Sequence, residues 1–141
     1  MAAIVVVLDQ LTKAWALQAL AAGPIAIIDG TVQFRLARNT GAAFSLFTRG
    51  GPIVGLVVIG VIIFIFVALG DASRRLEAVA LGLVLGGAVG NLIDRLFRGD
   101  DFLSGAVIDW VYTSFFPTFN VADTAVTFGV VLLLLSAFLR R

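Results

Sequence analysis

Four long apolar stretches constrain this chain more than any other feature, because a helix needs about 20 apolar residues to cross the hydrocarbon core of a bilayer. They cover about residues 2–22, 52–70, 78–93 and 121–139. With 60% hydrophobic and only 13% charged residues, the chain lies far from the composition of soluble proteins. We therefore expect an all-α membrane protein with four transmembrane helices, forming a single domain over residues 1–141.

The residue types that are absent narrow the possible chemistry. The sequence has no cysteine and no histidine, which excludes disulfides, thiol nucleophiles, imidazole bases and the usual zinc ligands. The net charge is +1 and the charges form no block, so we expect no nucleic-acid partner. Any reaction must use carboxylates, hydroxyls, amides or lysine, and we expect neither a metal nor another cofactor.

The first apolar stretch could also be a cleaved signal peptide, since Ala21 and Ala22 would suit a cleavage site. A signal peptide has a basic start and an uninterrupted apolar centre. Here the start is uncharged, and Asp9 and Lys13 interrupt the centre. We therefore interpret this stretch as a membrane span, so that the four spans place both termini on one side.

Counting positive charges does not orient the chain. If the termini are cytoplasmic, the inner arginines are Arg74, Arg75, Arg140 and Arg141, and the outer arginines are Arg35, Arg38, Arg49, Arg95 and Arg98. The two groups are nearly equal, so the positive-inside rule does not decide the orientation.

Two connections are longer than the linking of helices requires. Around residues 24–50, Val32, Phe34 and Leu36 alternate with more polar residues, the period of a half-buried strand, and we predict a small extramembrane β cradle there. The connection around residues 96–120 is rich in aromatic residues, which favour a membrane interface. We predict that it forms an interfacial loop or helix along the lipid headgroups.

Polar and small residues within the spans indicate close packing. An ionisable group within a span costs at least about 2.5 to 3.5 kcal/mol, so it normally has a partner or a function. Asp9 and Lys13 are four residues apart and lie on one helical face, which favours an ion pair; a role in supporting a site is the alternative. Gly82, Gly86 and Gly90 are also four apart, which is typical of tightly packed helices.

Asp123 has no basic residue within one helical turn. If the connection before it folds back, Asp109 can meet Asp123 at one membrane face. Two carboxyl groups at close range share a proton, which supplies a general base and a general acid, as in aspartic proteases. The alternative, which spacing alone favours equally, is that Asp123 caps its own helix and interacts with the helix dipole.

Five motifs occur in the order found in signal peptidase II, the bacterial lipoprotein signal peptidase. They are D-x-x-T-K at Asp9, Thr12 and Lys13, N-T-G-A-A-F-S at Asn39–Ser45, G-G-A-V-G-N-L-I-D-R at Gly86–Arg95, V-I-D-W at Val107–Trp110 and F-N-V-A-D at Phe119–Asp123. Each motif alone is weak, but their ordered occurrence over most of the chain resembles this family specifically.

The resemblance implies an aspartic endopeptidase that removes signal peptides from bacterial prolipoproteins, cutting just before a cysteine that carries a diacylglyceryl group. It implies Asp109 and Asp123 as the catalytic pair, and, as substrate-binding or supporting residues, Asn39, Asn91, Arg95, Asn120, Asp94, Asp9 and Lys13. It also implies a monomer in the cytoplasmic (inner) membrane, in contact with lipid, with cytoplasmic termini and an active site near the outer face.

Three features depart from the family pattern. Trp110 stands where Phe is usual, and Phe116 precedes Pro117 where Trp is common. The stretch between Asp94 and Asp109 is longer than usual, around Arg98–Gly105, which leaves open how it lies over the substrate groove.

Three other classes of function fit parts of the sequence. A serine protease could use Ser45 with Lys13 as its base, although Asp9 favours the charged form of Lys13. A proton pathway could use the acidic residues, but these gather near the ends of their spans and no inverted repeat is visible. A membrane scaffold would explain the glycine-rich third span but not the ordered motifs.

Overall fold

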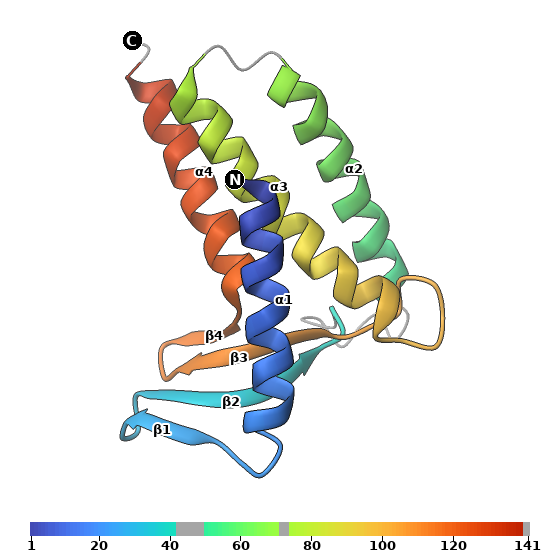
Figure 1. Ribbon diagram of the computed structural model, residues 1–141, viewed down its shortest axis with the longest axis vertical. Coiled ribbons are helices and arrows are strands. Elements are labelled where there is room, and N and C mark those ends of the chain that lie inside the picture. The colour runs from blue at the N-terminus through green and yellow to red at the C-terminus, as the bar shows by residue number, and fades with distance from the viewer. Residues whose placement is uncertain (42–49, 71–73, 140–141) are drawn as a thin grey trace.

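The computed structural model describes residues 1–41, 50–70 and 74–139, and it consists of four helices beside one small sheet (Figure 1). In chain order the elements are α1 (Ala2–Ala19), β1 (Ile25–Ile28), β2 (Val32–Asn39), α2 (Gly50–Gly70), α3 (Arg75–Phe97), β3 (Val107–Thr113), β4 (Phe116–Phe119) and α4 (Val121–Phe138). The helices run alongside one another, and the sheet lies at the end where α1 and α3 finish and α4 begins.

Three of these helices are long and apolar enough to cross a membrane. They span Pro52–Gly70, Arg75–Phe97 and Val121–Phe138, with mean hydropathies of 3.2, 1.8 and 2.0. Helix α1 is not among them, because Asp9, Gln10 and Lys13 interrupt its apolar sequence. The described part of the chain thus contains the four predicted helices. Three of them have the length and apolar composition of a membrane span.

Helix α2 exposes large apolar side chains on its surface. It contains no charged residue, and Phe64 and Phe66 are each 71% exposed. Large apolar side chains at this exposure are unfavourable in water and suit contact with lipid tails.

The sheet has four antiparallel strands in the order β1-β2-β3-β4. The β cradle predicted around residues 24–50 is present as β1 and β2. The loop or helix predicted for residues 96–120 is wrong, because residues 107–119 form β3 and β4 of the same sheet. Asp109 stands opposite Ala37 of β2 in this pairing. The β-branched and aromatic residues of Val107–Thr113 favour a strand once β2 supplies a partner that is distant in sequence.

Helix α3 is the centre of the bundle, and its glycines set the spacing. A side chain at Gly86 would lie 2.7 Å from the Ala2 carbonyl oxygen of α1, and one at Gly90 would lie 2.6 Å from Asp9 Oδ2. Gly87 faces the Ala122 carbonyl of α4 just as closely. The close packing predicted from the glycine spacing is confirmed, and it brings the polar residues of α1, α3 and α4 within reach of one another.

The long stretch between Asp94 and Asp109 folds inward against α2. Leu103 is fully buried, has a positive φ of 59° and packs against the position of Gly55, where any side chain would collide with it. Gly105 donates its backbone N–H to the Arg95 carbonyl at 3.0 Å. This stretch therefore leads the chain tightly from the end of α3 into β3.

A triangle of aromatic rings holds α1 against the sheet. Trp15, Phe34 and Trp110 lie edge to face, with ring centroids 5.2 to 5.7 Å apart. Such pairs contribute about 0.5 to 1.5 kcal/mol each beyond their buried area. Trp110, one of the departures from the family pattern, is thus part of the contact that fixes α1 beside β3.

Candidate active site

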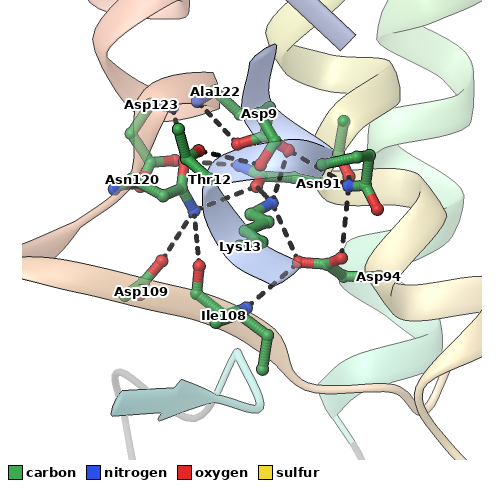
Figure 2. A network of polar contacts seen from close by, with 12 residues as sticks. Asp9, Thr12, Lys13, Asn91, Asp94, Ile108, Asp109, Asn120, Ala122 and Asp123 are labelled. Atoms are coloured by element: carbon green, nitrogen blue, oxygen red, sulfur yellow. Dashed lines mark hydrogen bonds and ion pairs between the residues drawn. The ribbon is translucent and has the colours of Figure 1, made fainter. Parts of the chain in front are cut away.

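The predicted site residues come from α1, β2, α3, β3 and the start of α4, which meet where the helices reach the sheet (Figure 2). Strand β2 ends with Asn39. Helix α1 carries Asp9 and Lys13, α3 carries Asn91 and Asp94, β3 carries Asp109, and the start of α4 carries Asp123. Asn120 lies between the last two elements as the N-cap of α4.

Asp109 is a buried carboxyl group, 3% exposed, on β3. Its Oδ1 accepts a hydrogen bond of 2.7 Å from Asn120 Nδ2, and its Oδ2 accepts one of 3.2 Å from Asn39 Nδ2. Burial, reinforced by the negative charge of Asp123, raises the pKa of Asp109 to about 6 against these two hydrogen bonds. Asp109 can therefore hold a proton far more readily than an ordinary aspartic acid.

Asp123 caps its own helix, one of the two alternatives predicted from the sequence, and it also joins the polar network of the site. Its Oδ2 accepts the Asn120 backbone N–H at 3.2 Å while Asn120 Oδ1 accepts the Asp123 N–H at 2.9 Å, which is a capping box. Its Oδ1 accepts a hydrogen bond of 2.8 Å from Asn91 Nδ2. Capping and a place in the polar site are therefore compatible, because each function uses a different carboxylate oxygen.

Asn120 connects the two aspartates. Its Nδ2 donates to Asp109, while its Oδ1 and its backbone N–H bond the backbone and side chain of Asp123. The same Nδ2 lies 3.1 Å from Asn91 Oδ1 and 3.3 Å from the Ile108 carbonyl. An amide between two carboxyl groups sets their relative position and adds no charge.

Asn91 has its amide orientation fixed by its neighbours. Its oxygen accepts from Lys13 Nζ at 2.9 Å and from Asn120 Nδ2, so its nitrogen is left to donate to Asp123. The Asn91 side chain therefore links the Lys13 ammonium to the Asp123 carboxylate by hydrogen bonds.

Lys13 forms a fully buried cluster of charges with Asp9 and Asp94, and Arg98 lies at its edge. Its Nζ lies 2.7 Å from Asp9 Oδ2 and 2.8 Å from Asp94 Oδ2, and Asp94 Oδ1 also accepts Arg98 Nε at 2.8 Å. The predicted ion pair between Asp9 and Lys13 is confirmed.

The same cluster ties separate elements together. Asp9 Oδ1 accepts the Ala122 N–H of α4 at 3.0 Å, and Asp94 Oδ2 accepts the Ile108 N–H of β3 at 3.1 Å. These aspartates fix the backbone beside Asp109 and Asp123.

Two members of this cluster were missed in the sequence. Gln10 Nε2 bonds Asp9, the Gly90 carbonyl and Asp94 at 3.1 to 3.3 Å. Arg98 follows Asp94 by four residues, a spacing that favours a helical ion pair and could have identified it. Thr12, in contrast, bonds back to the carbonyls of its own helix at Leu8 and Asp9.

Arg95 lies close to the site but outside its hydrogen-bond network as described. The residue is 6% exposed, and its positive charge interacts with Asp109 and Asp94. Its Nη1 is buried and makes no hydrogen bond within the described part of the chain, and both of its terminal nitrogens lie 3.4 Å from where Gly41 would carry a side chain. Arg95 therefore presents an uncommitted donor beside Asp109.

The other predicted chemistries receive little support. Ser45, the candidate nucleophile, lies outside the described residues, and so does most of the second motif. Lys13 pairs with two carboxylates, which stabilise its charged form and oppose a role as a base. Within residues 1–41, 50–70 and 74–139, no group of three acidic residues is placed to hold a metal ion.

Comparisons with known proteins agree over almost the whole chain. Residues 1–139 match the family model described as signal peptidase (SPase) II. A lipoprotein signal peptidase of Mycobacterium tuberculosis is 43% identical over 139 residues, covering 95% of this chain and 67% of the relative. One from Mycolicibacterium smegmatis is 46% identical over 137 residues, covering 94% of this chain and 57% of the relative.

Two solved structures share the fold. Both are described as bacterial membrane enzymes and are 28% identical to this chain, with TM-scores of 0.83 and 0.81. They match 96% and 97% of this chain over 88% and 84% of their own length. The family match, the identity to the mycobacterial relatives and the shared membrane-enzyme fold lead to one conclusion: this chain belongs to the signal peptidase II family.

Proposed function

We propose that this protein is an aspartic endopeptidase that removes signal peptides from diacylglyceryl-modified prolipoproteins, cutting just before the lipid-modified cysteine. The relatives are named lipoprotein signal peptidases, and membership of their family makes the chain a protease. The observation that carries the aspartic mechanism is the bridge from Asp109 through Asn120 to Asp123.

In the proposed mechanism one aspartate is protonated at rest and the other is ionised. We assign the resting proton to Asp109, because burial raises its pKa to about 6. Asp123 accepts N–H donors at both oxygens, as an ionised carboxylate does, and takes a proton from the attacking water. Asp109 then polarises the scissile carbonyl by donating its proton toward the oxygen. The proton that Asp123 has gained passes to the leaving amine, so neither residue forms a covalent bond with substrate.

The remaining predicted residues position this pair or the substrate. Asn39, Asn91 and Asn120 orient the two carboxyl groups through their amides. Asp9, Lys13 and Asp94 fix the elements that carry them. The Arg95 guanidinium is suited to bind a carbonyl of the extended substrate beside Asp109.

We also propose that α1 is a fourth span, since its charges are paired inside the bundle and need not face lipid. The start of α1 and the end of α4 both point away from the sheet, which supports two termini on one membrane face (Figure 1). We place these termini in the cytoplasm and the site near the outer face of the inner membrane, in a monomer with one domain.

The test uses a purified full chain and two forms of one precursor, with and without the diacylglyceryl group, in the presence of EDTA. Mass spectrometry should find a released signal peptide and a product that begins at the lipid-modified cysteine, from the lipid-modified precursor alone. Cleavage at another bond, equal cleavage of both precursors, or complete loss of cleavage in EDTA would contradict the proposal.

A further inference from the structure

The loop of residues 98–105 is held at two points, one on α3 and one on α2. Gly105 donates its N–H to the Arg95 carbonyl at 3.0 Å and packs against the backbone there so closely that a side chain would collide. Leu103 is fully buried against α2, and a side chain on Gly55 would lie 2.9 Å from three of its atoms. The loop therefore joins the end of α3 to the first turns of α2 (Figure 1).

This loop is compact around Leu103. The Ser104 hydroxyl accepts the Asp101 N–H at 3.0 Å and donates to the Asp101 carbonyl at 2.7 Å. Leu103 has a φ of 59°, which a residue with a side chain adopts only where its surroundings compel it. The contact with α2 is thus kept against the local preference of the backbone, which indicates a position that the fold requires.

The first turns of α2 also border the space around the Arg95 guanidinium. A side chain at Gly41 would lie 3.4 Å from both terminal nitrogens of Arg95 and 3.5 Å from Val54 Cγ2. Gly41 thus fills the space between α2 and the guanidinium, and its N–H donates to Asn39 Oδ1 at 2.9 Å. Val54 is the neighbour of Gly55, so the loop and the guanidinium contact the same turn of α2.

We infer that Leu103 is a positioning residue for Arg95. Nη1 of Arg95 is buried and makes no hydrogen bond among the residues that the structure describes, and its charge interacts with Asp109. In the proposed function, on which this inference rests, that guanidinium binds a carbonyl of the extended substrate. By packing against Gly55, Leu103 holds the first turns of α2 in place around the guanidinium. The donor is then ordered before the substrate arrives, which lowers the entropy lost on binding.

Shortening Leu103 tests this inference by kinetics. In Leu103→Ala we expect KM for a diacylglyceryl precursor to rise about tenfold and kcat to stay within about twofold, because a hydrogen bond that substrate and transition state share affects KM alone. A protein that is only less stable would lose folded enzyme, which lowers the apparent kcat and leaves KM unchanged. An unchanged KM in Leu103→Ala would overturn the inference.

Two variants of the same loop serve as controls. Phe102→Ala shortens the neighbouring side chain, which is 69% exposed, and should keep the wild-type KM. Leu103→Met keeps the volume of the buried side chain and should also keep it. A rise in KM in Phe102→Ala as large as in Leu103→Ala would show that the whole loop matters and not the contact with Gly55.

The dependence on Arg95 is tested by combining substitutions. Arg95→Met removes the guanidinium and keeps most of its apolar stem. If Leu103 acts through Arg95, adding Leu103→Ala to this variant should change KM by less than about twofold. The same rise of about tenfold in both backgrounds would show that Leu103 affects substrate by another route and would overturn the inference.

A second measurement does not depend on turnover. Phenylglyoxal modifies accessible arginines; Arg95 is 6% exposed and therefore protected, whereas Arg38 on β2 is exposed and serves as the internal reference. In folded Leu103→Ala the rate at Arg95 relative to Arg38 should rise about threefold or more, because the turn of α2 beside it opens locally. An unchanged relative rate would overturn the inference. If the wild-type chain cleaves no precursor, the proposed function fails, and the labelling still decides whether Leu103 positions Arg95.

Discussion

Two groups of buried carboxylates lie side by side in this protein and are treated in opposite ways. Asp9 and Asp94 are fully buried and share the Lys13 ammonium at 2.7 and 2.8 Å. Asp109 and Asp123 have only amides and backbone N–H groups as hydrogen-bond partners among the described residues. A cation neutralises a carboxylate and makes it structural, whereas amides orient it and leave its proton free to move.

The largest expected effect comes from removing the cation that Asp9 and Asp94 share. Lys13→Met leaves Asp9 and Asp94 without their shared cation, and removing one partner of a buried ion pair costs about 3 to 5 kcal/mol. We expect a large fall in the thermal unfolding temperature in detergent. Gln18→Met, on an exposed position of the same helix, should change the free energy of unfolding by less than about 0.5 kcal/mol. A Lys13→Met protein as stable as wild type would remove the distinction between the two groups.

A substitution of Asn120 tests the bridge between Asp109 and Asp123. Asn120→Ser keeps a side chain that caps α4 but cannot reach both aspartates, whereas Asn120→Ala loses the cap as well. We expect both variants to lose about 100-fold in kcat/KM, because the positions of the proposed catalytic pair, Asp109 and Asp123, relax. Only the alanine variant should also lose about 1 kcal/mol of stability. Wild-type activity in Asn120→Ser would show that the amide only caps the helix.

The pH dependence follows from the raised pKa of Asp109. The proposed mechanism requires the Asp109 proton. Because the pKa of Asp109 is about 6, cleavage should decline as the pH rises above about 6, with an apparent value that belongs to the coupled pair. Asn39 donates a hydrogen bond that lowers this pKa, so Asn39→Ala should move the decline to higher pH, by less than about one unit. Gln33→Ala on the same strand serves as the control. A shift to lower pH in Asn39→Ala would contradict the assignment of the proton to Asp109.

The same raised pKa has a consequence for stability. The folded chain binds a proton at Asp109 more tightly than the unfolded chain does, so this carboxyl group stabilises the fold below pH 3.8 and its contribution disappears as the pH rises through about 6. Asp109→Asn should remove this part of the pH dependence, as measured by thermal unfolding between these pH values.

The smallest effect is expected at Arg98, at the edge of the cluster formed by Asp9, Lys13 and Asp94. The Arg98 side chain is 27% exposed, and Asp94 keeps its contacts with Lys13 and the Ile108 N–H when Arg98 is removed. Arg98→Ala should cost about 1 kcal/mol or less in stability. A loss as large as that of Lys13→Met, measured in the same unfolding experiment, would show that Lys13 alone does not neutralise Asp94.

The sequence predicted the helices better than the connections between them. Apolar length placed α2 and α4 to within about two residues, because hydropathy acts locally along the chain. Helix α3 extends three or four residues beyond each predicted end of its apolar stretch, since Glu77 and Asp94 are buried within the bundle.

What sequence could not supply are the contacts between distant segments. The ion pair of Asp9 with Lys13 was predictable because both lie on one helix, whereas the pair of Lys13 with Asp94 joins α1 to α3. Strand β3 was misinterpreted as an interfacial loop or helix because its partner, β2, lies about 70 residues earlier in the chain. The order of the motifs named the catalytic candidates, and only the fold shows that Asn120 connects them.

We propose that Asp109 and Asp123 perform the chemistry and that Asp94 stabilises the fold. The most direct measurement is cleavage of one diacylglyceryl precursor by Asp109→Asn, Asp123→Asn and Asp94→Asn, with thermal unfolding recorded for each purified protein. We predict that the first two variants fold and lose about 1,000-fold or more in kcat/KM, and that Asp94→Asn unfolds at a lower temperature while its folded fraction still cleaves. Near wild-type cleavage by a folded Asp109→Asn or Asp123→Asn protein would contradict this assignment of the two aspartates.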